Sequence, residues 1–282
     1  MTLITNQQTL EIYLPNQLET VEGEHSLFTK ITPWLKEAEL WIEQYICHIG
    51  MINEQDQTFN LLQNIAALHA FALAIPSLDL ILTPNGFGIV SNANVAPASK
   101  DRVERLVKSL IKQRNNILQH TLHILQDNPT WHETIQAKFW QKTLWQDLSI
   151  AAIVKDILSD KPNDDFKTYI NIQPTIRAIE TSVAMDVVSI ELMQQLRQQI
   201  CRPDKTESVS KLASLVKMLV YKILVAELKG KTIFCKNDCA LIADFIKKNV
   251  TDFADWTQSQ QAALWLNPDT FENTKEAHGY FF

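Results

Sequence analysis

The spacing of hydrophobic residues predicts two long helices in the first half of the chain. Apolar residues recur every three or four positions from Leu61 to Ile75, which is the pattern of a helix with a buried face. Pro76 follows at once. Because proline lacks an amide donor and its ring clashes with the preceding turn, we expect the helix to end there. A second amphipathic stripe, from Val103 to Leu125, predicts another long helix.

A short β-hairpin is predicted between these two helices. Its arms are Leu78–Thr83 and Phe87–Val90, which flank Pro84, Asn85 and Gly86. Asn-Gly readily adopts the positive φ angles that tight hairpin turns require. The order helix, hairpin, helix is therefore the arrangement around which we expect the rest of the chain to fold.

Two further helices are predicted nearer the N-terminus. Thr5 opens a capping-box pattern, so a short helix is expected over Asn6–Leu14. Thr32 as the N-cap and Pro33 at the first helical position predict the next helix, which we expect to end near Gly50.

The chain also carries a predicted internal boundary, the polar and turn-forming run Asp160–Asp165. We expect an N-terminal helical unit over residues 1–128 with the hairpin at 78–90, aromatic-rich linking helices over residues 129–162, and a C-terminal helical unit over residues 163–282. The rings of the linking helices are Trp131, Phe139, Trp140 and Trp145. Such rings either pack where two halves of a chain meet or line a ligand pocket.

The second half of the sequence repeats the order of the first. Pro33 corresponds to Pro174 (174 − 33 = 141), and each is followed six residues later by a glutamate. The helical pattern around Phe71 corresponds to that around Tyr221 (221 − 71 = 150), and a shorter segment, residues 229–234, takes the place of the hairpin. We therefore predict a mainly α protein of two related helical units in tandem, the second a degenerate repeat.

Composition supports a helical protein and limits its partners. The 282 residues are 46% apolar, enough for real cores, and only six glycines count against sandwiches, barrels and phosphate-binding loops. A net charge of −6 provides no overall basic face, so DNA contact is not expected. We see no run of about 20 apolar residues and no signal-peptide pattern at Met1–Thr5, so we expect a cytoplasmic protein without a membrane partner.

Chemistry-bearing motifs are missing from the sequence. It contains no phosphate-binding loop, dinucleotide fingerprint, nucleophile elbow or zinc-binding helix motif. Cys235 and Cys239 could face the same way on a helix and hold a metal, but two more ligands are missing nearby, and buried thiols are the simpler explanation. We therefore predict no enzymatic activity, no catalytic residue, no small-molecule substrate, no cofactor and no metal site.

Three stretches together resemble a known class of proteins. They are Leu3–Pro15, Ile31–Ile46 with its acidic and alanine-rich centre, and the hairpin region followed by Lys100–Leu106. The first two resemble head–tail connector (adaptor, head-completion) proteins of tailed bacteriophages. The third, followed by the aromatic segment Trp131–Trp145, is similar to an uncharacterised family from Bacteroidetes phages and prophages. The second hairpin and the last six residues depart from that pattern.

This resemblance implies a virion structural protein that forms a ring beneath the portal at the phage neck. Its partners would be further copies of itself and the portal and tail proteins, first in the host cytoplasm during assembly and then in the virion neck. The candidate interface residues are Thr83, Pro84, Asn85, Gly86, Phe87, Tyr280, Phe281 and Phe282. The hairpin either reaches a neighbouring subunit or folds back on its own helices.

A cytoplasmic helical module that binds a protein or peptide is the alternative. Its groove would lie between the two halves and would be lined by the four rings of the linking helices.

Overall fold

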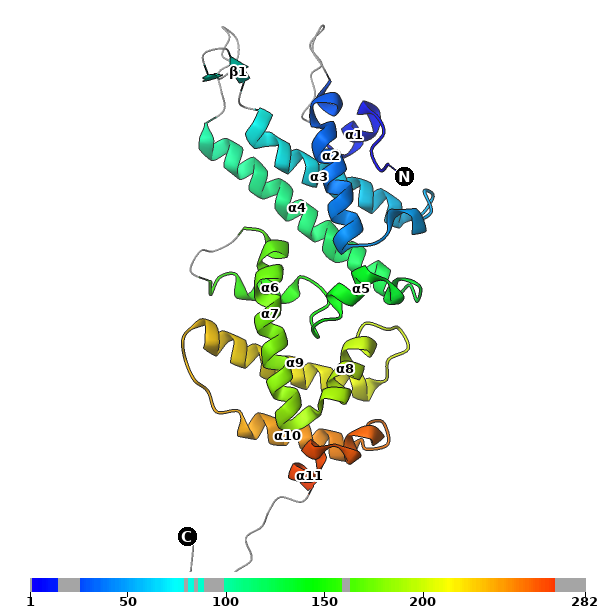
Figure 1. Ribbon diagram of the computed structural model, residues 1–282, viewed down its shortest axis with the longest axis vertical. Coiled ribbons are helices and arrows are strands. Elements are labelled where there is room, and N and C mark those ends of the chain that lie inside the picture. The colour runs from blue at the N-terminus through cyan, green and yellow to red at the C-terminus, as the bar shows by residue number, and fades with distance from the viewer. Residues whose placement is uncertain are drawn as a thin grey trace, which may run out of the picture. The chain divides into compact units, whose positions relative to one another are not determined.

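The computed structural model describes residues 2–14, 26–78, 81–83, 86–88, 99–158 and 163–266 (Figure 1). These residues are mainly α-helical, so the predicted fold class is confirmed at that level. The chain divides into two compact units, unit 1 from Met1 to Ile172 and unit 2 from Gln173 to Phe282.

This division differs from the predicted boundary at Asp160–Asp165. The segment 129–162 belongs to unit 1 and is not a separate linker. Burial explains the difference, because Trp131 and Trp140 are completely buried there and donate hydrogen bonds to carbonyl groups near residue 46. Burial of these large rings stabilises unit 1 enough to keep the segment within it, in spite of the polar turn that follows.

Unit 1 consists of helices that pack around one nearly enclosed helix, α3. The elements are α1 (Gln7–Tyr13), α2 (Leu27–Tyr45), η1 (Ile49–Met51), α3 (Gln57–Leu78), β1 (Ile81–Thr83), β2 (Gly86–Gly88), α4 (Lys100–Gln126), η2 (Trp131–Glu133), α5 (Ile135–Trp140) and α6 (Ser149–Val154). Helices α2 and α4 pack against α3 along its length, and α1 also contacts it. The helix α7 (Asp165–Val183) starts in unit 1 and continues in unit 2.

Both predicted proline boundaries in unit 1 are wrong. Helix α2 begins six residues before Pro33, with Ser26 as its N-cap, and α3 continues past Pro76 to Leu78. The hydroxyl of Thr32 donates to the Phe28 carbonyl at 2.8 Å, next to the turn that proline perturbs. Burial of the flanking helix faces outweighs the local cost of the ring, which sequence rules alone overestimate.

Helix α1 is shorter than predicted and is capped differently. It spans Gln7–Tyr13, and the side chain of Asn6 accepts from the Thr9 amide at 2.8 Å, in place of a capping box opened by Thr5. Asparagine is as good an N-cap as threonine, and it stands one position nearer to the helix.

The two strands form a very short antiparallel pair. Ile81 pairs with Gly88 and Thr83 with Gly86. The predicted arms were longer, but Leu78 belongs to α3, and residues 84–85 and 89–98 lie outside the described part of the chain.

Helix α3 corrects one expectation from composition. It is long and apolar enough to span a membrane, although no such run was expected. Most of its apolar stretch is buried inside unit 1, between α2 and α4, so its apolar character is accounted for by core packing.

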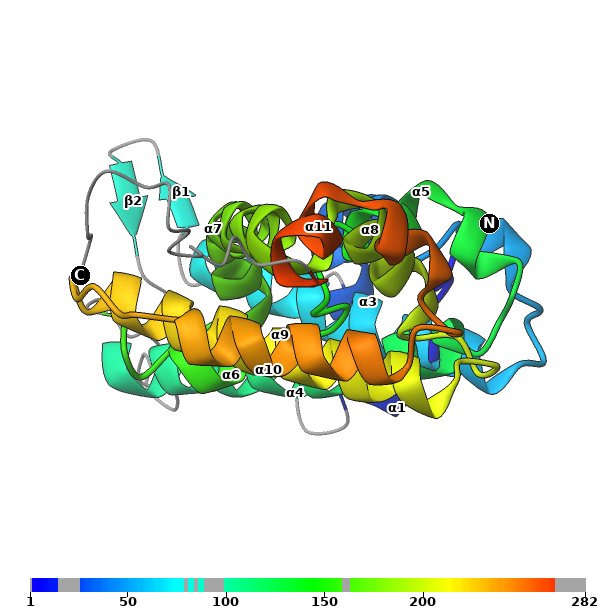
Figure 2. The same cartoon turned by 90° about the horizontal axis from the view of Figure 1, so that it is seen from below.

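Unit 2 is also a set of packed helices. After α7 come a π-helical turn η3 (Ala184–Val188), α8 (Ile190–Gln199), α9 (Glu207–Leu228), α10 (Lys236–Lys248), η4 (Ala254–Gln258) and α11 (Gln260–Leu266). Helices α9 and α10 lie side by side (Figure 2). Ser189, between η3 and α8, has a φ of 79°, which is rare for a residue with a side chain.

Candidate functional site

The predicted interface residues fall at the edge of the described chain. Thr83, Gly86 and Phe87 lie in β1 and β2, for which the backbone is described. Pro84, Asn85 and the run 280–282 lie outside the described residues. Their part in an interface therefore stays a prediction.

The aromatic residues of the supposed linking segment do not line an open groove. Trp131 and Trp140 are fully buried and Trp145 is nearly so. Trp140 stacks on Tyr169 with ring centroids 5.0 Å apart, and Phe139 meets Tyr45 edge-on at 5.2 Å. The rings form a packing centre inside unit 1, whereas the sequence predicted either a ligand pocket or packing where two halves of the chain meet.

Two tryptophans bind the C-terminal end of α2 through hydrogen bonds. The indole nitrogen of Trp131 donates to the Ile46 carbonyl, and that of Trp140 donates to the Tyr45 carbonyl, each at 2.7 Å. These carbonyls lie at the C-terminus of a helix, where backbone acceptors lack helical partners. Thr134 caps the short helix between the two tryptophans by accepting from the Ala137 amide at 3.1 Å.

Unit 2 contains the same arrangement. The indole of Trp256 donates to the Val187 carbonyl at 2.9 Å, and that of Trp265 donates to the Asp186 carbonyl at 2.8 Å. Ser259 accepts from the Ala262 amide at 3.1 Å, as Thr134 does in unit 1.

Sequence reasoning missed this second copy, although a signal for it exists. Residues 131–140 read W-x-x-T-x-Q-A-x-x-W, and residues 256–265 read W-x-x-S-x-Q-A-x-x-W. The spacing is constant (256 − 131 = 265 − 140 = 125). This offset of 125 residues differs from the offsets of 141 and 150 found for the two helical patterns, because the segments before the motif have different lengths in the two halves.

A glutamate in each unit ties another segment of the chain to its own helix. In unit 1, Glu39 accepts from the Leu3 amide at 2.6 Å, which fixes the N-terminal segment against α2. In unit 2, Glu180 is completely buried and accepts from the Arg197 guanidinium at 2.8 Å, which fixes α8. Each glutamate therefore fixes a different kind of segment, an N-terminal extension in unit 1 and a helix in unit 2.

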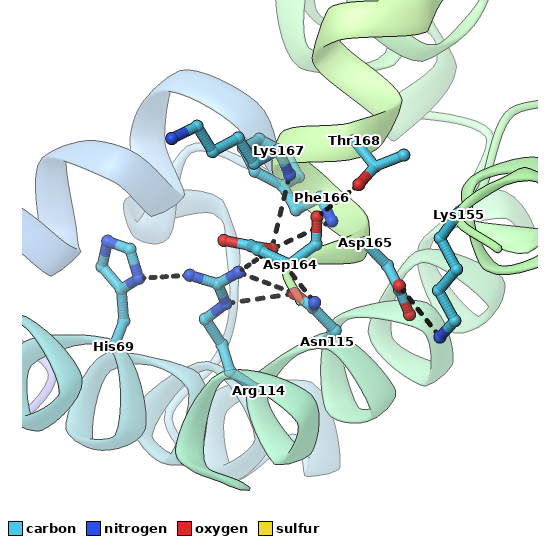
Figure 3. A network of polar contacts seen from close by, with 9 residues as sticks. All are labelled: His69, Arg114, Asn115, Lys155, Asp164, Asp165, Phe166, Lys167 and Thr168. Carbon is cyan, nitrogen blue, oxygen red and sulfur yellow. Dashed lines mark hydrogen bonds and ion pairs between the residues drawn. The ribbon is translucent and has the colours of Figure 1, made fainter. Parts of the chain in front are cut away.

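A buried polar cluster in unit 1 joins α3, α4 and the start of α7 (Figure 3). Arg114, only 3% exposed, donates to Asp164 at 2.7 Å and to the Nδ1 atom of His69 at 2.8 Å. Asn115 donates to Asp164 at 3.1 Å, and the same carboxylate oxygen accepts from the Phe166 amide at 3.0 Å. Asp164 therefore caps the first turn of α7 while it pairs with a cation of α4.

The charges in this cluster determine its protonation. Burial, together with the adjacent Arg114 charge, lowers the pKa of His69 to about 3. Burial disfavours ionisation of Asp164, but Arg114 and the hydrogen bonds from Asn115 and the backbone outweigh it, so the pKa of Asp164 lies below its usual value. His69 is thus neutral and acts as an acceptor, while its ring stacks on Trp41 at 4.7 Å.

This cluster has the chemistry of a site that stabilises the fold. Each polar group described above is used to hold two or three helices together, and the guanidinium also lies 5.1 Å from the centre of the Trp41 ring. Burial and the Glu43 charge raise the pKa of Cys47 to about 12, and burial followed by nearby acidic groups raises that of Cys239 to about 11, so neither of these two thiols is activated as a nucleophile. Within the described chain, no group of three or more metal-ligating side chains is found.

An open apolar groove in unit 2 is the feature best suited to contact a partner. It lies between the first half of α9 and the second half of α10 and has a volume of about 630 Å³. Its apolar lining is Leu215, Met218, Leu241 and Phe245, and its polar lining is Glu207, Ser210, Lys211, Ser214, Asp244 and Lys248. Met218 is 45% exposed and Leu241 is 51% exposed.

Comparison with known proteins gives one match. The model of a family of unknown function (DUF6712) matches residues 21–139, which covers α2, α3, α4, η2 and most of α5 in unit 1. No curated protein and no solved structure matches the chain.

Proposed function

We propose that this chain is a structural protein of a tailed phage or prophage, a head–tail connector that works through contacts with further copies of itself and with portal and tail proteins. The single observation that carries the proposal is the open groove between α9 and α10. Two of its apolar side chains, Met218 and Leu241, are about half exposed, on a unit whose buried Glu180 is already paired with Arg197. An apolar surface of this kind is typical of a protein interface.

We also infer that the two units are copies of one helical module. The buried positions of α2, which are Ile31, Leu35, Ala38 and Ile42, correspond one by one to Ile172, Ile176, Ile179 and Val183 of α7. Helices α3 and α9 have the same length of 22 residues. The paired tryptophan contacts at the end of each unit support the same conclusion.

The β1–β2 pair belongs to this proposal as a second contact element. It lies between α3 and α4, at the place where unit 2 has the exposed segment between α9 and α10. Short strands with free edges can pair with a neighbouring chain. Substitution Phe87→Asp is expected to leave the circular dichroism spectrum unchanged and to abolish assembly. Unfolding of the variant would instead assign Phe87 to the core of its own unit.

The decisive experiment measures self-association of the full chain. Light scattering over a concentration series, combined with negative-stain images, is expected to show association that increases with concentration and ends in rings. A chain that stays monomeric at every concentration and binds a peptide in the α9–α10 groove would instead support the alternative, a peptide-binding module.

A further inference from the structure

The segment between α9 and α10 carries an unusually exposed aromatic side chain. Phe234 is 99% exposed, and the neighbouring Ile233 is 38% exposed. A phenylalanine ring that is completely hydrated gives up the burial energy that such rings normally contribute. Phe234 is therefore available to insert into an apolar site on another molecule.

The apolar groove and this phenylalanine lie at opposite ends of the same helix pair. The groove uses residues 207–218 of α9 and 241–248 of α10, whereas Phe234 follows the end of α9 and precedes the start of α10. Since Phe234 is almost fully exposed, it does not fill the groove of its own unit. An exposed aromatic side chain at one end and a groove at the other can therefore meet when two copies associate head to tail.

We propose that Phe234 of one copy docks into the α9–α10 groove of a second copy. The proposal names the contact through which the self-association suggested above takes place, and it rests on that suggestion. The groove volume of about 630 Å³ lies in the range of pockets that hold drug-sized ligands, so it can accept this ring together with Ile233.

Charge neither opposes this pairing nor drives it, so the contact depends on apolar burial. Lys229, Lys231 and Lys236 flank Phe234 in the sequence and are exposed, while Asp186 and Glu227 line the same surface as Phe234. The groove offers two carboxylates, Glu207 and Asp244. Lys211 and Lys248 also line it, Lys211 lies 2.7 Å from Glu207, and Lys247 lies 3.8 Å from Asp244, so the groove is close to neutral.

The area involved sets the strength of the contact. One aromatic ring buries roughly 150–250 Å², whereas a stable interface buries about 800 Å² on each partner. The contact alone is therefore weak, and association is expected to depend on concentration. In a ring, neighbouring contacts and the portal surface would add to it.

The test uses sedimentation equilibrium on the full chain and two variants. Phe234→Ser removes the inserted ring, and Met218→Glu combined with Leu241→Glu blocks the groove. Each is expected to weaken self-association by at least about 30-fold, the loss typical of one dominant interface residue. Leu264→Ser and Met185→Glu, which are 65% and 55% exposed elsewhere in unit 2, serve as matched controls and are expected to associate like the wild type.

A mixture of the two variants gives the sharper result. Each variant alone lacks one half of the contact, but the pair retains one intact half on each chain, so a one-to-one mixture is expected to form a heterodimer and nothing larger. A mixture that stays monomeric, or a Phe234→Ser chain that associates like the wild type, would overturn this inference while the connector proposal survives. A wild-type chain that stops at a closed dimer would support the contact and contradict the ring.

Discussion

Glu39 and Glu180 each stand six residues after a proline inside a helix, and each accepts hydrogen bonds from another segment of the chain. Glu39 receives the Leu3 amide, and Glu180 receives the Arg197 guanidinium. The chemistry differs although the position is the same: one carboxylate meets a neutral backbone donor at a half-buried site, and the other is completely buried against a charge. The two glutamates are therefore expected to differ in their contribution to stability.

Substitution Glu180→Ala is expected to lower the free energy of unfolding by about 3–5 kcal/mol, because Arg197 loses its buried counter-charge. Glu39→Ala is expected to cost only about 1 kcal/mol, the usual loss for one hydrogen bond. Urea denaturation followed by circular dichroism measures both. In the double variant Glu180→Leu with Arg197→Leu most of the loss should be recovered. Equal losses of unfolding free energy at positions 39 and 180 would show that the buried charge pair stabilises the chain no more than a single neutral hydrogen bond.

The tryptophan contacts predict a second difference between the units. Trp140 is fully buried and Trp265 is only partly buried, although each donates to a backbone carbonyl, of Tyr45 at the end of α2 and of Asp186 in η3. Replacement of Trp140 by phenylalanine leaves a part-buried carbonyl without its donor and a small cavity at a fully buried side chain, so a loss of about 2–4 kcal/mol is expected. Trp265→Phe is expected to cost about 1 kcal/mol or less, because water can reach the carbonyl. Thermal unfolding measures this order, and a larger loss at position 265 would contradict it.

The sequence was sufficient for the helical class and for the faces of the long helices, because burial repeats every three or four residues along α2 and α9. It failed at Pro33 and Pro76, where packing of α2 and α3 outweighs a local rule. It also left open whether Trp131 lines a pocket, because the carbonyl that this indole binds lies 85 residues earlier. No sequence pattern indicated the α9–α10 groove, because an exposed apolar helix face has the same spacing of apolar residues as a buried one.

The neutral state of His69 predicts a stability that depends on pH. Its pKa is about 3 in the folded chain and about 6.5 when exposed, so the unfolded state binds the extra proton first as the pH falls. The stabilisation is fully present above pH 6.5 and is lost between pH 6.5 and 3, with a slope of about 1 kcal/mol per pH unit. Asp164, whose pKa is lowered, adds a further loss at the acid end of this range.

Urea denaturation at several pH values between 7 and 4 measures this slope. Substitution His69→Gln keeps an acceptor for Arg114 but cannot be protonated, so it is expected to flatten the curve above pH 5. His48, an exposed histidine that pairs with Glu43 at 2.7 Å, provides the matched control His48→Gln. A wild-type curve that is flat between pH 6.5 and 4 would mean that His69 is protonated without cost, in conflict with its contact to the guanidinium.

The backbone of Ser189 predicts opposite effects of two small substitutions. Its backbone has φ 79° and ψ 154°, a region that is essentially restricted to glycine, and its hydroxyl caps α8 by accepting from the Leu192 amide at 3.2 Å. Ser189→Ala keeps the backbone strain and loses the cap, so a loss of about 1 kcal/mol is expected. Ser189→Gly also loses the hydroxyl but relieves a strain of about 1–3 kcal/mol, so it is expected to be the more stable variant. Glycine also ranks above alanine at ordinary N-caps, so the diagnostic result in thermal unfolding is a glycine variant at least as stable as the wild type. An alanine variant more stable than the glycine variant would show that the chain between η3 and α8 adopts an ordinary backbone conformation in solution.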